Sequence, residues 1–118
     1  PFSIFKGQKL HGDELILEVQ CFLEDNYQLK LGIDDLSEKY AIGRRTFERR
    51  FKKATSNTIV EYIQRIRVEA AKKQMELGHK NVSEIMYEVG YTDPKAFREV
   101  FKKYCGISPA EYRDKFRR

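Results

Sequence analysis

Hydrophobic side chains recur along this chain three and four positions apart, which is the period of an amphipathic helix. Leu15, Ile16, Val19, Phe22 and Leu23 show this spacing first and predict a helix over residues 13–27. Further helices are predicted over residues 33–40, 44–54, 58–77, 82–89, 93–104 and 108–115. Because strand-like alternation is absent, the pattern predicts an all-α fold.

Capping residues and glycines set the expected helix ends. Segments 58–61 and 108–111 both place Ser or Thr three residues before Glu, the form of a capping box. Asp93 and Pro94 supply a cap and a first-turn proline. Gly78 and Gly106 follow the expected ends of two helices.

The chain contains an internal repeat. Residues 33, 36 and 40 match residues 82, 85 and 89 at an offset of 49. After one inserted residue, the text F-x-x-x-F-K-K, then a cap residue, then x-x-E-Y, recurs at an offset of 50. Each copy predicts a short helix, a tight turn that contains glycine, and a second helix with a basic outer face. That is the layout of a helix-turn-helix motif.

Charge is distributed unevenly along the chain. Residues 1–43 carry 4 Lys and Arg against 8 Asp and Glu, whereas residues 44–118 carry 19 against 10. The segment 44–53 alone has six cations and one anion. A basic patch on a helical domain favours a polyanionic partner, with nucleic acid first.

The second helix of each copy is the candidate contact surface, because its two Phe residues are expected to face inward. The outward residues are then Arg45, Glu48, Arg49 and Lys52 in the first copy, and Lys95, Ala96, Arg98, Glu99 and Lys102 in the second. We interpret both as recognition helices that enter a major groove, where Arg and Lys donate to guanine or phosphate. A Glu there accepts from cytosine or orients a neighbouring Arg. The alternative interpretation is a solvated basic helix face.

The helix expected between the two copies offers a geometric check. Twenty residues, 58–77, span about 30 Å. Successive major-groove faces are separated by about 34 Å. We therefore expect one chain to place its two recognition helices in adjacent major grooves.

Three segments resemble the DNA-binding domain of the AraC/XylS family of bacterial transcription regulators. They are L-x-x-x-x-A-I-G-R-R-T-F-E-R-R-F-K-K at 36–53, Y-I-Q-R-I-R-V-E-A-A at 62–71, and the segment 85–113 with its G-Y-T-D-P turn and G-I-S-P cap. The resemblance implies seven helices in two helix-turn-helix subdomains, at about 33–54 and 82–104. A long helix at about 58–77 would join them, a final helix would cover about 108–115, and the domain would span 13–118 after an extended lead-in at 1–12.

The resemblance also assigns candidate contacts, residue by residue. The family's base-contacting positions fall on Arg45, Glu48, Arg49, Lys95, Ala96 and Glu99. Phosphate contacts are expected from Arg44, Arg50, Lys52, Lys53, Arg98 and Lys102. Since Ala96 and Glu99 are poor phosphate partners, we expect the second helix to position the domain more than it specifies sequence.

The lead-in implies a longer protein. Its text P-F-x-x-F-K-G-Q-K-L-H-G-D, with Gln20, resembles a subgroup whose regulatory N-terminal domain is PfpI-type, that is, glutamine-amidotransferase-like. We expect such a domain, or another sensor, upstream of Pro1. The isolated domain is then expected to be monomeric and the full-length protein dimeric through that upstream domain. Promoter DNA and RNA polymerase are the expected partners, in the cytoplasm and at the nucleoid.

Other classes of protein are disfavoured by what the sequence lacks. Two isolated cysteines, Cys21 and Cys105, and two isolated histidines predict no metal site and no cofactor, and we expect both thiols to be buried. No catalytic constellation is present, so no enzyme is predicted. The longest aliphatic run is three residues, which excludes a membrane span. A non-specific nucleic-acid binder and a helical protein-interaction module stay open as alternatives.

Overall fold

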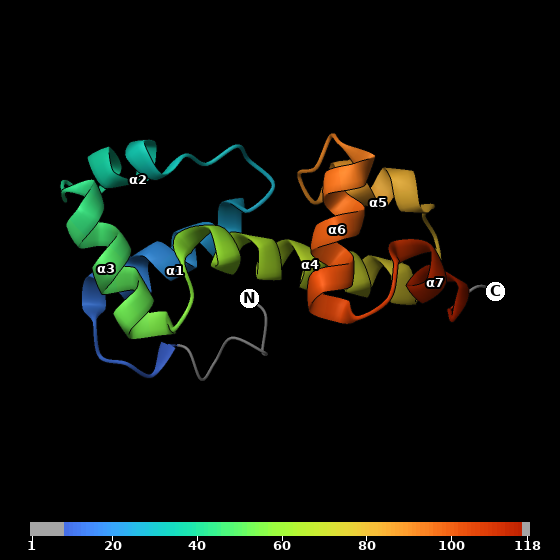
Figure 1. The fold of residues 1–118 in the computed structure, drawn as a ribbon, viewed down its shortest axis with the longest axis horizontal. Helices are drawn as coiled ribbons and strands as arrows, with labels where there is room; N and C mark the ends of the chain where they lie inside the picture. Colours follow the sequence, from blue (N-terminus) through green and yellow to red (C-terminus); the bar gives the residue numbers. More distant parts are fainter. Residues whose placement is uncertain (1–8, 117–118) are drawn as a thin grey trace. The chain divides into compact units, whose positions relative to one another are not determined.

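The computed structural model describes residues 9–116, and this part of the chain is all-helical (Figure 1). Its helices are α1 (Glu14–Asn26), α2 (Ile33–Lys39), α3 (Arg44–Thr55), α4 (Ile59–Leu77), α5 (Val82–Glu88), α6 (Pro94–Cys105) and α7 (Pro109–Asp114). All seven predicted helices are confirmed, each end lying within one residue of its expected place. Most of the expected lead-in, residues 1–8, lies outside the described residues. Residues 9–11 form a turn and not an extended segment.

Hydrogen bonds at the helix starts explain this agreement. Both predicted capping boxes are present: the Thr58 and Glu61 side chains each accept from the other's backbone N–H, and Ser108 and Glu111 do the same. A third capping box, formed by Asn81 and Glu84 at the start of α5, was not predicted. The N-x-x-E text at 81–84 was its signal.

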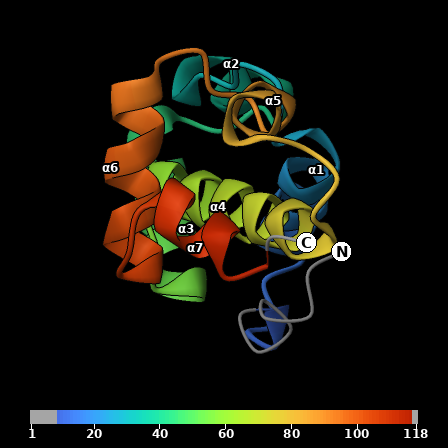
Figure 2. The ribbon, with the colours of Figure 1, turned by 90° about the vertical axis from the view of Figure 1, so that its right-hand side faces the viewer.

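The described chain divides into two compact units, and the boundary between Ile63 and Gln64 falls inside α4. The first unit holds α1, α2, α3 and the start of α4. The second holds the rest of α4 with α5, α6 and α7, which Figure 2 shows grouped around that part of α4. The predicted linker helix is present as α4, and each of its ends belongs to the core of one unit.

Each unit has its own aromatic core, built from one Tyr and the two Phe residues of the second helix of its helix-turn-helix motif, α3 or α6. In the first unit the rings of Phe47 and Phe51 lie 6.4 Å apart, and that of Tyr62 lies 5.4 Å from Phe51. In the second unit the matching distances are 5.9 Å for Phe97 and Phe101, and 5.7 Å for Phe101 and Tyr112. All four Phe side chains are buried, which confirms the predicted inward face. Burial of a side chain of this size contributes about 1.5–3 kcal/mol.

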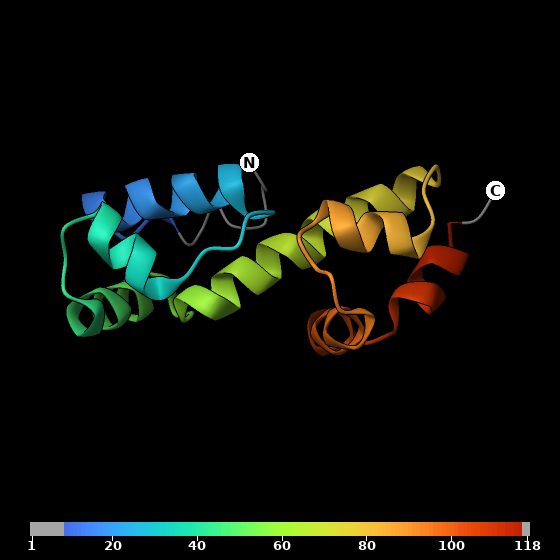
Figure 3. The same cartoon turned by 90° about the horizontal axis from the view of Figure 1, so that it is seen from above.

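The turn inside each helix-turn-helix motif needs a residue in the left-handed region. In the second unit α6 lies across α5 (Figure 3), and Gly90 makes the turn between them with φ +104°. In the first unit Ala41 makes this turn, with φ +51°. The glycine of that turn, Gly43, is the N-cap of α3 with φ −63°. The turn contains glycine as predicted, but the strained position falls on alanine.

The expectation of two buried cysteines was wrong. Cys21 is exposed and Cys105 is half-buried. The core-facing row of α1 consists of Ile16, Val19 and Leu23. Cys21 falls between Val19 and Leu23 in the sequence, and helical geometry places it on the opposite side of the helix.

Candidate nucleic-acid interface

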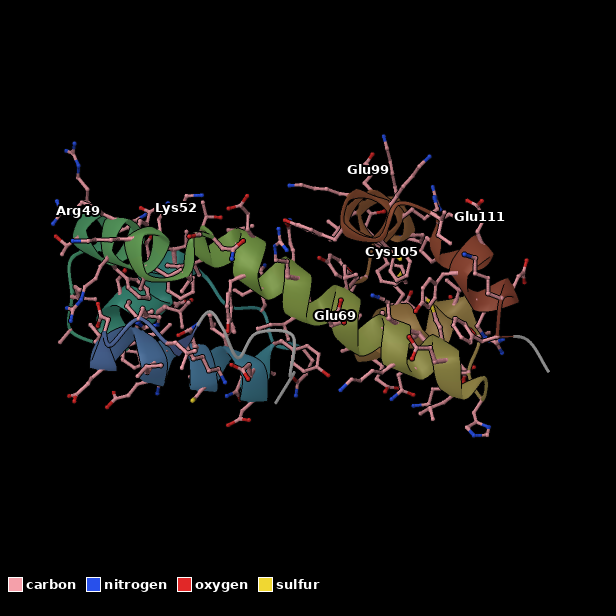
Figure 4. All side chains as sticks on the ribbon, turned by 90° about the horizontal axis from the view of Figure 1, so that it is seen from below. Arg49, Lys52, Glu69, Glu99, Cys105 and Glu111 are labelled. Carbon is pink, nitrogen blue, oxygen red and sulfur yellow. The ribbon has the colours of Figure 1, made fainter. Side chains whose placement is uncertain are left out.

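Helix α3 carries six cationic side chains, more than any other described helix. Its apolar face, Phe47 and Phe51, is fixed in the core, so its other faces are turned to solvent. Arg45 and Arg49 are exposed there, as predicted, and neither pairs with any side chain in residues 9–116. Figure 4 shows Arg49 extending away from the helix, with Lys52 further along it.

A charged bridge occupies the start of α3. Arg44 donates from Nε to Oε1 of Glu48 at 3.3 Å and from Nη1 to Oδ1 of Asp34 at 3.2 Å. The hydrogen bond to Glu48 and the charge of Asp34 raise the pKa of Arg44, which stays cationic. Glu48 therefore orients a neighbouring arginine, one of the two roles expected of it.

The other predicted phosphate contacts of α3 differ from one another. Arg50 makes a two-point ion pair with Asp13, at 2.7 Å from Nε to Oδ2 and 3.0 Å from Nη2 to Oδ1. This pair raises the pKa of Arg50 and lowers that of Asp13. Lys52 donates to the Ser56 carbonyl at 3.2 Å. Lys53 is exposed and has no ion pair within the described part of the chain.

Helix α6 presents fewer cations. Asp93 caps its start by accepting from the Lys95 backbone N–H at 3.1 Å, and Pro94 is its first residue. The side chains predicted to face outward are exposed, namely Lys95, Arg98, Glu99 and Lys102. Glu99 is labelled in Figure 4. Ala96, which was also predicted to face outward, is half-buried and lies on the flank of the helix beside half-buried Val100.

The cations of α4 are used within the second unit. Arg65 stacks on Tyr104 with 4.8 Å to the ring centroid, and Arg67 stacks on Tyr91 at 5.0 Å. Lys72 pairs with Glu69 at 3.3 Å. These three cations of α4 therefore have partners within the second unit.

Sequence reasoning missed two ion pairs that α3 makes with other elements, Arg44 with Asp34 and Arg50 with Asp13. The second is the more distant in the chain. Arg50 and Asp13 lie 37 positions apart, and neither periodicity nor the repeat contained a signal that joined them. Within residues 9–116, no cluster of three or more His, Cys, Asp or Glu side chains could hold a metal ion. No helix in that range is both long and apolar enough to cross a membrane.

Two helix-turn-helix units, each with a basic and exposed second helix, define a DNA-binding domain of the kind found in transcription regulators. The comparisons with known proteins agree. A family model described as a helix-turn-helix domain matches residues 36–115. The chain belongs to this family, and within it to the AraC-type domains that bind DNA sequence-specifically in transcription regulation.

Relatives and solved structures support this assignment. The transcriptional regulatory protein YesN of Bacillus subtilis is 38% identical over 114 residues, which cover 90% of this chain and 30% of YesN. The transcriptional activator RhaS of Mannheimia succiniciproducens is 33% identical over 92 residues, 78% of this chain and 34% of RhaS. The DNA-binding domain of AdpA, solved with a target DNA, is 28% identical with a TM-score of 0.80, covering 86% of this chain and 91% of that one. This chain thus spans about a third of the length of these two regulators.

Proposed function

We propose that α3 and α6 are the recognition helices and that they enter adjacent major grooves of promoter DNA. The observation that carries the proposal is the exposure of Arg45 and Arg49 without an internal partner, on a helix whose opposite face is fixed by Phe47 and Phe51. The positive charges of Arg45 and Arg49, one helical turn apart, repel each other. DNA that binds them neutralises this charge and releases its own condensed counterions, which favours binding.

The proposed contacts fall into two groups. Arg45, Glu48 and Arg49 of α3 would face base edges, where an arginine can bind guanine O6 and N7 with two hydrogen bonds. Lys95, Ala96 and Glu99 are the proposed base-contacting residues of α6. Phosphate contacts are proposed for Arg44, Lys52, Lys53, Arg98 and Lys102, and Arg50 is treated separately below.

For the whole protein, we propose a bacterial transcription regulator that acts in the cytoplasm at the nucleoid. RNA polymerase is its proposed further partner, and an upstream PfpI-type or other sensor domain would dimerise it. The names of its relatives as transcriptional regulators support this role. The lead-in text that suggests a PfpI-type domain lies mostly in residues 1–8, outside the described part of the chain.

The test is a selection of random duplex oligonucleotides on the 118-residue chain at about 150 mM salt, because low salt exaggerates phosphate contacts. We expect an enriched site with two elements about one helical turn apart. A variant with Arg45→Ala and Arg49→Ala should lose enrichment of one element. Binding without enrichment would indicate a non-specific binder, and absence of binding would favour a protein-interaction module.

A further inference from the structure

The segment Lys9–Asp13, which we call the strap, is bonded to the first unit through the side chains of Lys9, His11 and Asp13. The Lys9 ammonium lies 2.7 Å from Oε2 of Glu24, and Nε2 of His11 lies 2.8 Å from Oε1 of Gln20. Both partners are buried residues of α1. Gly12, with φ +78°, then turns the chain into that helix.

The strap's partners form a buried polar network with the core tyrosine. The Gln20 amide donates to the Tyr62 hydroxyl at 3.2 Å, and that hydroxyl donates to Oε2 of Glu24 at 3.3 Å. Gln20 and Tyr62 have no exposed surface. Because each buried polar group has a partner, the network holds one arrangement, and the strap has a fixed place on the unit.

At its other end the strap holds α3. Asp13 caps α1 through Oδ1, which accepts from the Ile16 backbone N–H at 3.2 Å, and its carboxylate also accepts the two hydrogen bonds from Arg50. The backbone N–H of Asp13 donates to Nδ1 of His11 at 3.0 Å. A two-point arginine–carboxylate pair fixes direction as well as distance, so it restrains both the position and the rotation of α3.

Arg50 does not share the DNA-facing side of its helix. At about 100° per residue, Arg50 is about 60° from the buried Phe47 and about 140° from Arg45. It lies at the flank of α3 nearest the core, beside the strap. The cations of the proposed base-contacting row are thus on one side of the helix, and the fixing point is on another.

We propose that Asp13 and His11 are positioning residues for DNA binding: through Arg50, the strap holds α3 at the rotation at which Arg45 and Arg49 meet the DNA. The inference rests on the proposed function of α3 as a recognition helix. Neither Asp13 nor His11 is proposed to contact DNA. Arg50 acts by fixing α3 through its ion pair with Asp13.

In the variant Asp13→Asn, the direction of the change in DNA affinity distinguishes two roles of Arg50. Asn caps a helix as well as Asp does, so α1 keeps its start. If the strap positions α3, this variant lowers affinity for the selected duplex about fivefold to tenfold. If Arg50 instead contacts phosphate, removal of its competing carboxylate raises affinity, and a rise or no change overturns the proposal.

Glu14→Gln is the matched control. Glu14 follows Asp13, is exposed and makes no ion pair with any described side chain. Its substitution by Gln removes the same negative charge as Asp13→Asn does. The affinity of this variant should stay the same or rise slightly, as expected when an anion near DNA is removed. Gly12→Ala changes no charge and strains the turn, and it should lower affinity as Asp13→Asn does. Thermal unfolding of every variant shows that binding is measured on folded protein.

The two hydrogen bonds of His11 connect the strap to the core. Because Nδ1 accepts from the Asp13 N–H, Nε2 donates to Oε1 of the buried Gln20. The ring therefore links Gln20 to the backbone of Asp13. His11→Ala removes both bonds and should lower affinity for the selected duplex about threefold to tenfold.

The second histidine provides the control. His79 is exposed in the loop after α4, so His79→Ala should keep full affinity. Full affinity in His11→Ala would overturn the role of His11.

Failure of this inference can be told apart from failure of the proposed function. If Arg45→Ala leaves affinity intact, α3 is not a recognition helix and the proposed function fails. If Arg45→Ala abolishes binding while Asp13→Asn does not weaken it, only the strap's role fails. A double variant, Asp13→Asn with Arg50→Gln, should bind no more weakly than either single variant, because both changes break one interaction.

Discussion

The two units repeat the same backbone with different residues at the points of strain. Ala41 and Gly90, at an offset of 49, both turn the chain between two helices, with φ of +51° and +104°. Ser56 and Gly106, at an offset of 50, end α3 and α6, with φ of +63° and +89°. The second unit uses glycine at both positions and the first unit at neither. The turn therefore forms whether or not its residue favours it, because the packed core on both sides fixes its path.

The tyrosine that closes each core is the most closely preserved feature. Tyr62 and Tyr112 each pack on the second Phe of their unit, and each hydroxyl donates to a glutamate, Glu24 at 3.3 Å and Glu76 at 2.6 Å. These glutamates belong to α1 and to the later part of α4. The comparison shows that the repeated unit includes one further helix at its start. The early part of α4 is the last helix of the first unit, and its later part is the first helix of the second unit.

The surfaces differ more than the cores. In the first unit Asp34, Arg44 and Glu48 form the charged bridge at the start of α3. The corresponding residues of the second unit, Ser83, Pro94 and Arg98, line an apolar groove of about 350 Å³ between α5, α6 and α7. Arg49 and its counterpart Glu99 have opposite charges. We infer that the two recognition helices contribute unequally to DNA binding.

The largest expected effect tests that inequality. Alanine at both Arg45 and Arg49 should weaken binding to a selected duplex about 100-fold, since each good base contact contributes about 1–3 kcal/mol. Alanine at both Lys95 and Arg98 should weaken it about tenfold. Titrations at a fixed salt concentration measure both. An equal or greater loss at the α6 pair would contradict the asymmetry.

The core tyrosines should differ in their contribution to stability. Tyr62→Phe leaves the buried Gln20 and Glu24 without a hydroxyl partner, and should lower the free energy of unfolding by about 1–3 kcal/mol. Tyr112→Phe should lower it by about 0.5–1 kcal/mol, because Glu76 is exposed and can bind water. Urea unfolding of both variants measures this, and equal losses would show that the two networks are equivalent.

Alkaline pH should weaken both units. Burial and the neighbouring glutamates raise the pKa of Tyr62 and Tyr112 above their ordinary value of 10.0. Folding therefore favours the neutral phenols, and their contribution is complete below pH 10 and lost as pH rises through the raised pKa. The free energy of unfolding should fall above about pH 10, less steeply in Tyr62→Phe than in the unaltered chain. An identical slope in the variant would exclude Tyr62 as a source.

The smallest effect exchanges the turn residues. Ala41→Gly should raise the free energy of unfolding by about 0.5–1 kcal/mol, because the strain of a left-handed alanine exceeds the entropy that glycine adds to the unfolded chain. Gly90→Ala should lower it by about 1 kcal/mol for the same reason. Thermal unfolding compares the two. A destabilised Ala41→Gly would mean that the alanine methyl group contributes more than its strain removes.

The candidate site could be predicted from the sequence only in part. The outward row of α3 was found because Phe47 and Phe51 fix the rotation of the helix, and helical spacing then places Arg45 and Arg49 opposite. The ion pair between Arg44 and Asp34 was not found from the sequence, because the two residues lie on different helices. Which of the predicted cations are unpaired depends on such neighbours.

The sequence by itself determined the seven helices, their caps and the duplication. These follow from hydrogen bonds and side-chain spacings that reach only a few residues, so the local text is sufficient. Only the tertiary structure decided that the unit boundary falls inside α4 and that Cys21 is exposed. It also decided that the backbone of Ala41 is in the left-handed region and that Asp13 forms an ion pair with Arg50. Each of these depends on how helices distant in the chain pack together, and packing forces residues into conformations and pairings that local preference does not select.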